Sequence, residues 1–158
     1  MKRRQKTATY SLLDELMASD KAPMPEAFRL HQLTAMHQAL RALEQEKEPN
    51  RNDWRCLSDC PNLMETLVEM GVVEDPAGLI RDAVDALALA GKRHRAGSAL
   101  RLDGRGLQAI RGVLSDYGSV LDAVPHRTMI RCHRKTELRY RDIRAGKRRG
   151  HDVEVVEL

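Results

Sequence analysis

The clearest helical pattern in the chain lies in residues 103–124, which read DGRGLQAIRGVLSDYGSVLDAV. From Leu107 to Leu121, apolar side chains return at every third or fourth position, which is the spacing of one face of an α-helix. Asp103 precedes this pattern and belongs to the residue types that favour the N-cap. We therefore expect a long amphipathic helix that begins after Asp103 and packs its apolar face on a core.

The pattern continues on both sides of this segment. Pro125 separates it from a second helix that ends before Gly146, because proline suits the first turn of a helix and glycine the position after the last turn. Apolar spacing and capping residues predict four further helices upstream. The expected helices cover about residues 11–19, 26–46, 52–71, 76–91, 103–124 and 126–145.

Proline and glycine make these helix limits more specific. Pro61 lies inside the third expected helix and predicts either a kink or a break there. Asp75 followed by Pro76 is typical of a helix start, with the aspartate as N-cap. Gly91 is expected to end that helix, so that the basic residues 92–95 form a loop.

Composition agrees with a helical fold. The chain has 158 residues, about the length of one domain. Aromatic residues make up 3% of it, whereas β-sandwiches and barrels are enriched in aromatic and β-branched residues. We expect an all-α, single-domain bundle of about six helices over residues 1–158, with a short C-terminal strand near 153–156 as an open alternative. Residues 1–6 and a tail at residues 146–158 are expected to be basic extensions of this bundle, and we expect the tail to be mobile.

The chain shows no sign of export or membrane insertion. The basic start is not followed by the apolar run of a signal peptide, and no stretch approaches 18 consecutive apolar residues. The sequence therefore predicts a soluble, cytoplasmic protein without a membrane partner. Three cysteines, Cys56, Cys60 and Cys132, are too few for a disulfide framework, and we expect reduced thiols that pack in the core. A zinc site with His133 is the alternative.

Charge is distributed unevenly along the chain. Residues 1–6 carry a net charge of +4, residues 7–125 carry −5, residues 126–150 carry +8 and the last eight carry −3. Within residues 126–150 arginine outnumbers lysine eight to two, and arginine makes bidentate hydrogen bonds to phosphate. This segregation predicts binding to nucleic acid or to another polyanion. The alternative is that the arginines are solvated or paired with acids of the body.

The candidate residues for this binding are the basic side chains of the last helix, the tail and the N-terminus. They are Arg127, Arg131, Arg134, Lys135, Arg139, Arg141, Arg144, Lys147, Arg148, Arg149, Lys2, Arg3 and Arg4.

No catalytic motif accompanies these residues. The paired carboxylates Glu65/Glu69 and Asp82/Asp85 have helical spacing, which is typical of a solvated helix face. We find no nucleophile–histidine–acid set with a recognisable context, and we expect no enzyme activity, no cofactor and no bound metal.

Two pairs of short segments resemble a group of known proteins. Residues 1–16, MKRRQKTATYSLLDEL, and residues 152–155, DVEV, are similar to the ends of uncharacterised small proteins from proteobacterial prophages and other mobile elements. The segments RLDG at 101–104 and QAIR at 108–111 are similar to them as well. The resemblance implies a genetic setting in which small non-enzymatic proteins regulate, package or block host machinery, and it transfers no functional residue.

These observations predict a non-enzymatic interaction protein of a phage or mobile element. Its expected partner is nucleic acid or a nucleic-acid-handling complex, bound through the basic C-terminal helix. An acidic protein surface is the other possible partner of this helix. The alternative function is a protein–protein module that inhibits or modulates a host defence or replication complex, through an exposed apolar patch or through the tail as an added strand. A homodimer is left open, because several helices carry wide apolar faces.

Overall fold

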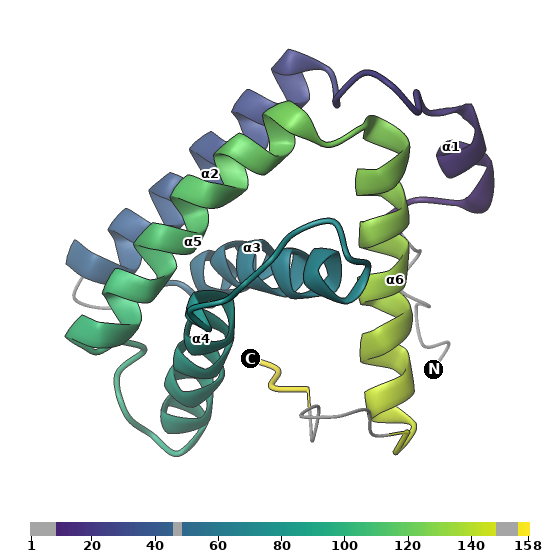
Figure 1. The fold of residues 1–158 in the computed structure, drawn as a ribbon. Coiled ribbons are helices and arrows are strands. Elements are labelled where there is room, and N and C mark those ends of the chain that lie inside the picture. Colours follow the sequence, from purple (N-terminus) through teal and green to yellow (C-terminus); the bar gives the residue numbers. More distant parts are fainter. Residues whose placement is uncertain (1–8, 46–48, 148–154) are drawn as a thin grey trace.

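The structure is a computed structural model, and it describes residues 9–45, 49–147 and 155–158. These residues form helices and connecting segments and contain no β-strand (Figure 1). The all-α class and the six expected helices are thereby confirmed. The helices are α1 (Leu12–Met17), α2 (Glu26–Gln45), α3 (Arg51–Glu69), α4 (Leu79–Arg95), α5 (Gly104–Ala123) and α6 (His126–Arg144).

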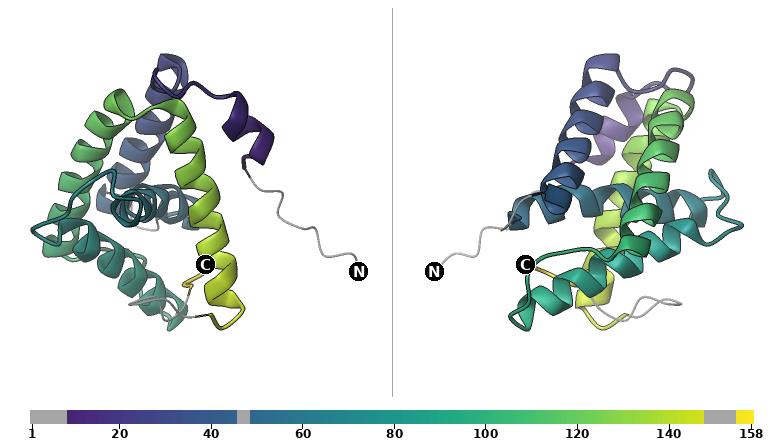
Figure 2. Two further views of the ribbon diagram at one scale, coloured as in Figure 1. Left: turned by 45° about the vertical axis from the view of Figure 1, so that its right-hand side comes forward. Right: turned by 90° about the vertical axis from the view of Figure 1, so that its left-hand side faces the viewer.

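Helix α3 is the centre of the bundle. It packs against α2, α4, α5 and α6, and α5 also packs against α2 and α4. In Figure 1, α2 and α5 run side by side along one flank, and α6 closes the other. Helix α1 stands outside this bundle with α6 as its main neighbour, as the left view of Figure 2 shows.

The core lies where the apolar faces of α3 and α5 meet. Leu57 and Leu67 of α3 and Tyr117 and Leu121 of α5 have no exposed surface. The Tyr117 hydroxyl accepts a hydrogen bond from the Gln32 side chain at 3.0 Å, so that its polar end is satisfied inside the core. Most of the apolar positions predicted for residues 107–121 are thus buried in α5, and Leu107 and Val120 are partly buried against the core.

Of the two alternatives at Pro61, a kink or a break, the break is absent. Helix α3 runs without interruption from Arg51 to Glu69, and Pro61 is buried within it. A proline inside a helix costs about 3 kcal/mol because it removes one backbone hydrogen bond. Four neighbouring helices pack on α3, and the apolar burial along its length outweighs that cost.

The predicted end of α4 at Gly91 is also wrong. The helix continues to Arg95, and Gly91 lies buried in its interior. A Cβ atom on Gly91 would lie 2.8 Å from Cζ2 of Trp54 and 2.9 Å from Cγ1 of Val156. Glycine is therefore present because two side chains approach the helix backbone there, and the basic residues 92–95 form the last helical turn instead of a loop. Cations are favourable in that turn because of the helix dipole.

Helix α4 begins three residues later than Asp75-Pro76 indicated. Its N-cap is Gly78, at a φ of 69°. Asp75 nevertheless acts on the helix start, since its Oδ2 accepts hydrogen bonds from the backbone N–H of Ile80 at 3.1 Å and of Arg81 at 3.4 Å. The aspartate supplies the acceptor that the sequence predicted, from a position further upstream.

The end of the chain lies against the bundle. Residues 155–158 contain no strand, and the other part of the proposed strand, residues 153 and 154, falls outside the described residues. Val156 and Leu158 are partly buried against the core. Together with side chains of α3, α4 and α6 they line a groove of about 770 Å³.

Candidate functional site

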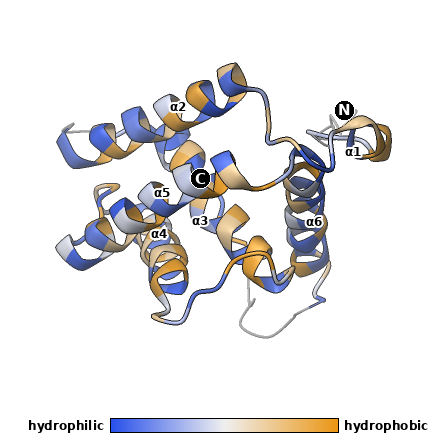
Figure 3. Ribbon diagram, turned by 45° about the horizontal axis from the view of Figure 1, so that its top comes forward, coloured by the Kyte–Doolittle hydropathy of each residue, from blue (hydrophilic) through white to orange (hydrophobic). Residues whose placement is uncertain are grey.

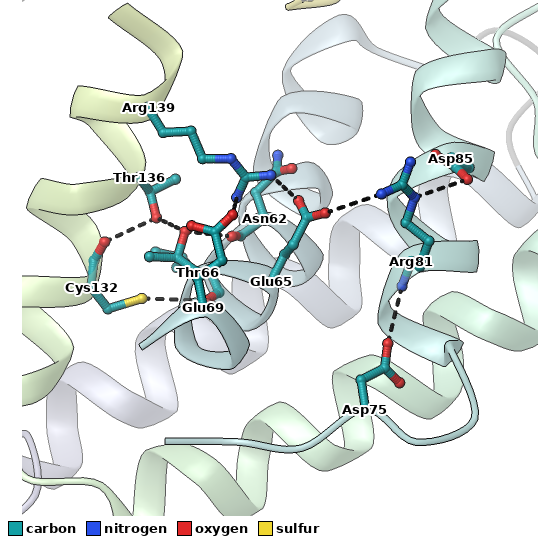
Figure 4. A network of polar contacts seen from close by, with 11 residues as sticks. Asn62, Glu65, Thr66, Glu69, Asp75, Arg81, Asp85, Cys132, Thr136 and Arg139 are labelled. Atoms are coloured by element: carbon teal, nitrogen blue, oxygen red, sulfur yellow. Dashed lines mark hydrogen bonds and ion pairs between the residues drawn. The ribbon is translucent and has the colours of Figure 1, made fainter. Parts of the chain in front are cut away.

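Helix α6 carries most of the predicted binding residues, and its inner face packs against α3. Met129, Cys132 and Thr136 are buried. The Cys132 thiol donates to the backbone oxygen of Leu63 at 3.2 Å, and the hydroxyls of Thr136 and Thr66 are 2.6 Å apart (Figure 4). These contacts set the rotation of α6 about its axis and turn most of its cations outward.

Arg139 does not point outward with the others. It forms an ion pair with Glu65 and a second one with Glu69 at 3.7 Å (Figure 4). Its side chain is 10% exposed, and Arg81 of α4 approaches the same Glu65 at 4.0 Å. Arg139 therefore holds α6 to α3, and it is not available to a ligand.

Three more of the predicted arginines hold the segment that contains α1. Arg131 Nε donates to Glu15 at 2.7 Å, and Arg134 donates to the other oxygen of the same carboxylate. Arg127 donates to the backbone oxygens of Ala18 and Leu16, both at 3.1 Å. We call residues 9–20 the arm.

The Glu15 carboxylate is the central acceptor of the arm. Its side chain is 8% exposed, although it belongs to a six-residue helix on the outside of the molecule. The hydrogen bond from Arg131 is the main cause that holds the pKa of Glu15 below its ordinary value, against the opposing effect of burial. Glu15 is therefore ionised at neutral pH and neutralises part of the charge of α6.

The remaining predicted residues fall into three groups. Arg144 pairs with Glu157, and Lys147 lies 4.0 Å from Asp142. The side chains of Lys135 and Arg141 are exposed and have no hydrogen-bond or ion-pair partner among the described residues. The other predicted residues, Lys2, Arg3, Arg4, Arg148 and Arg149, lie outside the described residues.

The most unusual surface is on α1, and its exposure could not be predicted from the sequence. Leu12, Leu13, Leu16 and Met17 are 56%, 66%, 60% and 79% exposed, whereas the buried residue of this helix is Glu15. We call these four side chains the α1 apolar face. Figure 3 shows its orange segments at the edge of the molecule. The apolar spacing in residues 10–17 was visible in the sequence, but apolar spacing alone does not distinguish a face that meets the core from one that meets solvent.

A groove lies beside the contact between the arm and α6, and residues of the arm, α6 and α3 line it. It has a volume of about 930 Å³, and Leu12, Lys135 and Arg141 are among its lining residues. Tyr10 contacts His133 edge to face in this region, with ring centroids 5.2 Å apart. Burial lowers the pKa of His133 to about 4, so the imidazole is neutral at neutral pH.

The buried cysteines have the low reactivity of thiols that pack in a core. Burial raises the pKa of Cys132 to about 12 and also raises that of Cys60, so neither thiol forms a nucleophilic thiolate at neutral pH. Within the part of the chain that the structure describes, no three His, Cys, Asp or Glu side chains are placed to hold a metal ion. No helix in that part has the length and apolar character that a membrane crossing requires.

Comparison with known proteins found no matching family model, no matching curated protein and no matching solved structure. The resemblance to prophage and mobile-element proteins therefore stays a prediction.

Proposed function

We propose that this chain is a non-enzymatic protein-interaction module whose contact surface is the α1 apolar face. The single observation that carries the proposal is the reversed orientation of α1, with a carboxylate buried and four large apolar side chains in solvent. Scattered exposed apolar residues need no explanation, but a contiguous exposed patch marks an interaction surface.

The energetics favour a partner on this face. Full burial of a leucine or methionine side chain contributes about 1.5–3 kcal/mol. Covering the exposed fractions of the four side chains would thus contribute about 4–8 kcal/mol. Association itself costs at least about 4 kcal/mol, so α1 alone supports weak binding and a stable complex requires further contacts.

Those further contacts are available beside α1. Leu12 lines the same groove as Lys135 and Arg141, the two cations of α6 that lack a partner among the described residues. An apolar centre beside exposed cations fits a protein surface with an apolar groove and an acidic rim. Because the apolar residues lie on a short helix, binding of α1 in a groove of the partner is the expected mode.

Site-specific photo-crosslinking in cells tests this proposal. A photo-reactive amino acid replaces Leu13 in one protein and Leu89 of α4, which is 48% exposed, in the control. We expect a discrete adduct from position 13 only. Leu16→Ser with Met17→Ser should abolish it, while the capping box of α1, in which Ser11 and Asp14 exchange hydrogen bonds, stays intact. Equal labelling from both positions would refute the proposal. An adduct of two chain masses would identify the partner as a second copy.

Polyanion binding by α6 is the second candidate function. It is favoured by the exposure of Lys135 and Arg141 and by the three further arginines, Arg131, Arg134 and Arg144, that line the same groove. Binding of labelled nucleic acid should weaken as salt increases, because phosphate contacts release counterions. Lys135→Gln with Arg141→Gln should weaken it further than the charge-matched pair Arg51→Gln with Arg55→Gln on α3. Equal losses of affinity from both pairs would show that net charge alone, and not the position of the cations, determines the binding.

A further inference from the structure

The cations of α6 divide into a covered and an open group along a single side of the helix. Arg127, Arg131 and Arg134 are spaced four and three residues apart, which places them on one face over about two turns. All three bind the arm. Lys135 and Arg141 continue toward the C-terminal end of the helix, beyond the acceptors of the arm, and are open.

The arm presents to this face the kind of groups that a phosphate backbone presents. One Glu15 carboxylate accepts from two arginines, and two backbone oxygens accept from Arg127. Asp20 places a second carboxylate 3.7 Å from Arg127. The result is a row of anionic and carbonyl oxygens along the helix, and guanidinium groups that bind such oxygens also bind phosphodiester oxygens.

The arm is held on α6 mainly by polar contacts. Its large apolar side chains face away from α6, apart from the edge contact of Tyr10 with His133. Within the arm the small side chain of Ala18 is buried, and the next apolar anchor is Met24, which is buried in the core beyond the arm. A segment attached in this way can leave α6 without uncovering a large apolar side chain, and salt weakens its ion pairs.

We infer that Arg127, Arg131 and Arg134 form a concealed binding site for the phosphodiester backbone of a nucleic acid, which the arm occupies with Glu15 in the place of a phosphate. The inference rests on the second candidate function, polyanion binding by α6. Withdrawal of the arm would join the open pair Lys135 and Arg141 to these three arginines, and it would also uncover Glu137, which accepts two hydrogen bonds from Thr9 of the arm.

The test compares two variants that remove one negative charge from an ion pair with arginine. Glu15→Gln releases Arg131 and Arg134, and Glu44→Gln releases Arg111 of α5, far from α6 in the chain. Binding of a labelled single-stranded oligonucleotide is measured by fluorescence anisotropy over a range of salt concentrations. Circular dichroism confirms that both variants are folded.

We expect Glu15→Gln to bind about tenfold more tightly than the wild type at low salt. Its salt dependence should be steeper by about 1.4 in the slope of log K against log salt, because each additional phosphate contact to a single strand contributes about 0.7. Glu44→Gln should keep the wild-type slope. Adding Arg131→Gln and Arg134→Gln to Glu15→Gln should remove the gain.

The possible failures are distinguishable. If the wild type binds through Lys135 and Arg141 but Glu15→Gln and Glu44→Gln behave alike, the concealed site is refuted and polyanion binding by α6 stands. If neither the wild type nor Glu15→Gln binds at low salt, both are refuted. The crosslinking result for the α1 apolar face is independent of either outcome.

Discussion

Replacing Gly91 by alanine tests a close packing contact between α4, Trp54 and Val156. The added Cβ would lie 2.8 Å from Cζ2 of Trp54 and 2.9 Å from Cγ1 of Val156, and both distances are too short for carbon atoms in contact. Trp54 cannot move away freely, because its indole N–H donates to the backbone oxygen of Leu87 at 2.9 Å. The ring, the chain end or α4 must therefore shift.

Two opposing terms set the size of the effect. Overpacking a dense core costs about 1–3 kcal/mol. Alanine in place of glycine inside a helix recovers about 1 kcal/mol or somewhat less. We expect a net loss of up to about 2 kcal/mol in the free energy of unfolding for Gly91→Ala, which lowers the melting temperature by up to about 8 °C in a domain of this size.

Gly118 provides the matched control. It also lies inside a long helix, but a Cβ there would meet the Leu33 side chain at 3.8 Å, an ordinary contact distance. Gly118→Ala should therefore stabilise the protein by up to about 1 kcal/mol. Urea unfolding followed by Trp54 fluorescence measures both variants. If Gly91→Ala proves as stable as Gly118→Ala, the close approach of Trp54 to α4 is wrong.

Three further predictions concern the site and its surroundings. Arg139→Gln should destabilise the protein by about 1–3 kcal/mol, because the largely buried Glu65 carboxylate loses its nearer arginine and keeps only Arg81 at 4.0 Å. Arg141→Gln should change stability by less than about 0.5 kcal/mol, and similar urea midpoints for the two variants would contradict this distinction. The ring of His133 should titrate near pH 4 in a proton NMR titration. Because its ordinary pKa of 6.5 applies in the unfolded chain, its contribution to stability is present above pH 6.5 and is lost as the pH falls toward 4. An unshifted titration would show that the ring is not buried. A thiol reagent should modify Cys56 in the native protein before the buried Cys60, which should react only after unfolding; equal native rates would show that the two thiols are equally accessible.

The helices were predictable because their signals are local. The capping box of Ser11 and Asp14, the Asp103 cap and the stop at Gly146 act within a few residues, and the structure has each of them. The helix break that was one alternative at Pro61, and the helix end predicted at Gly91, are wrong because packing against distant elements outweighed the local preference. Neither the packing of helices around Pro61 nor the approach of Trp54 and Val156 to Gly91 can be recognised from the neighbouring residues in the sequence.

The candidate site was predictable only as a concentration of charge. The sequence identified α6 as the basic element, but it could not distinguish Arg139, which is paired in the interior, from Arg141, which is open to solvent. Ion pairing depends on the acids that tertiary packing brings near. Glu65 and Glu69 reach Arg139 only because α3 lies against α6.

The sequence by itself determined where the helices form and which faces are apolar, since helical spacing and caps depend on neighbours a few residues away. Tertiary structure alone decided which apolar face reaches the core and which cations stay unpaired. The Glu15 carboxylate meets Arg131 across 116 residues of chain, and that contact turns the leucines of α1 toward solvent. The orientation of a short helix follows from the surface on which it docks, and residues distant in the sequence form that surface.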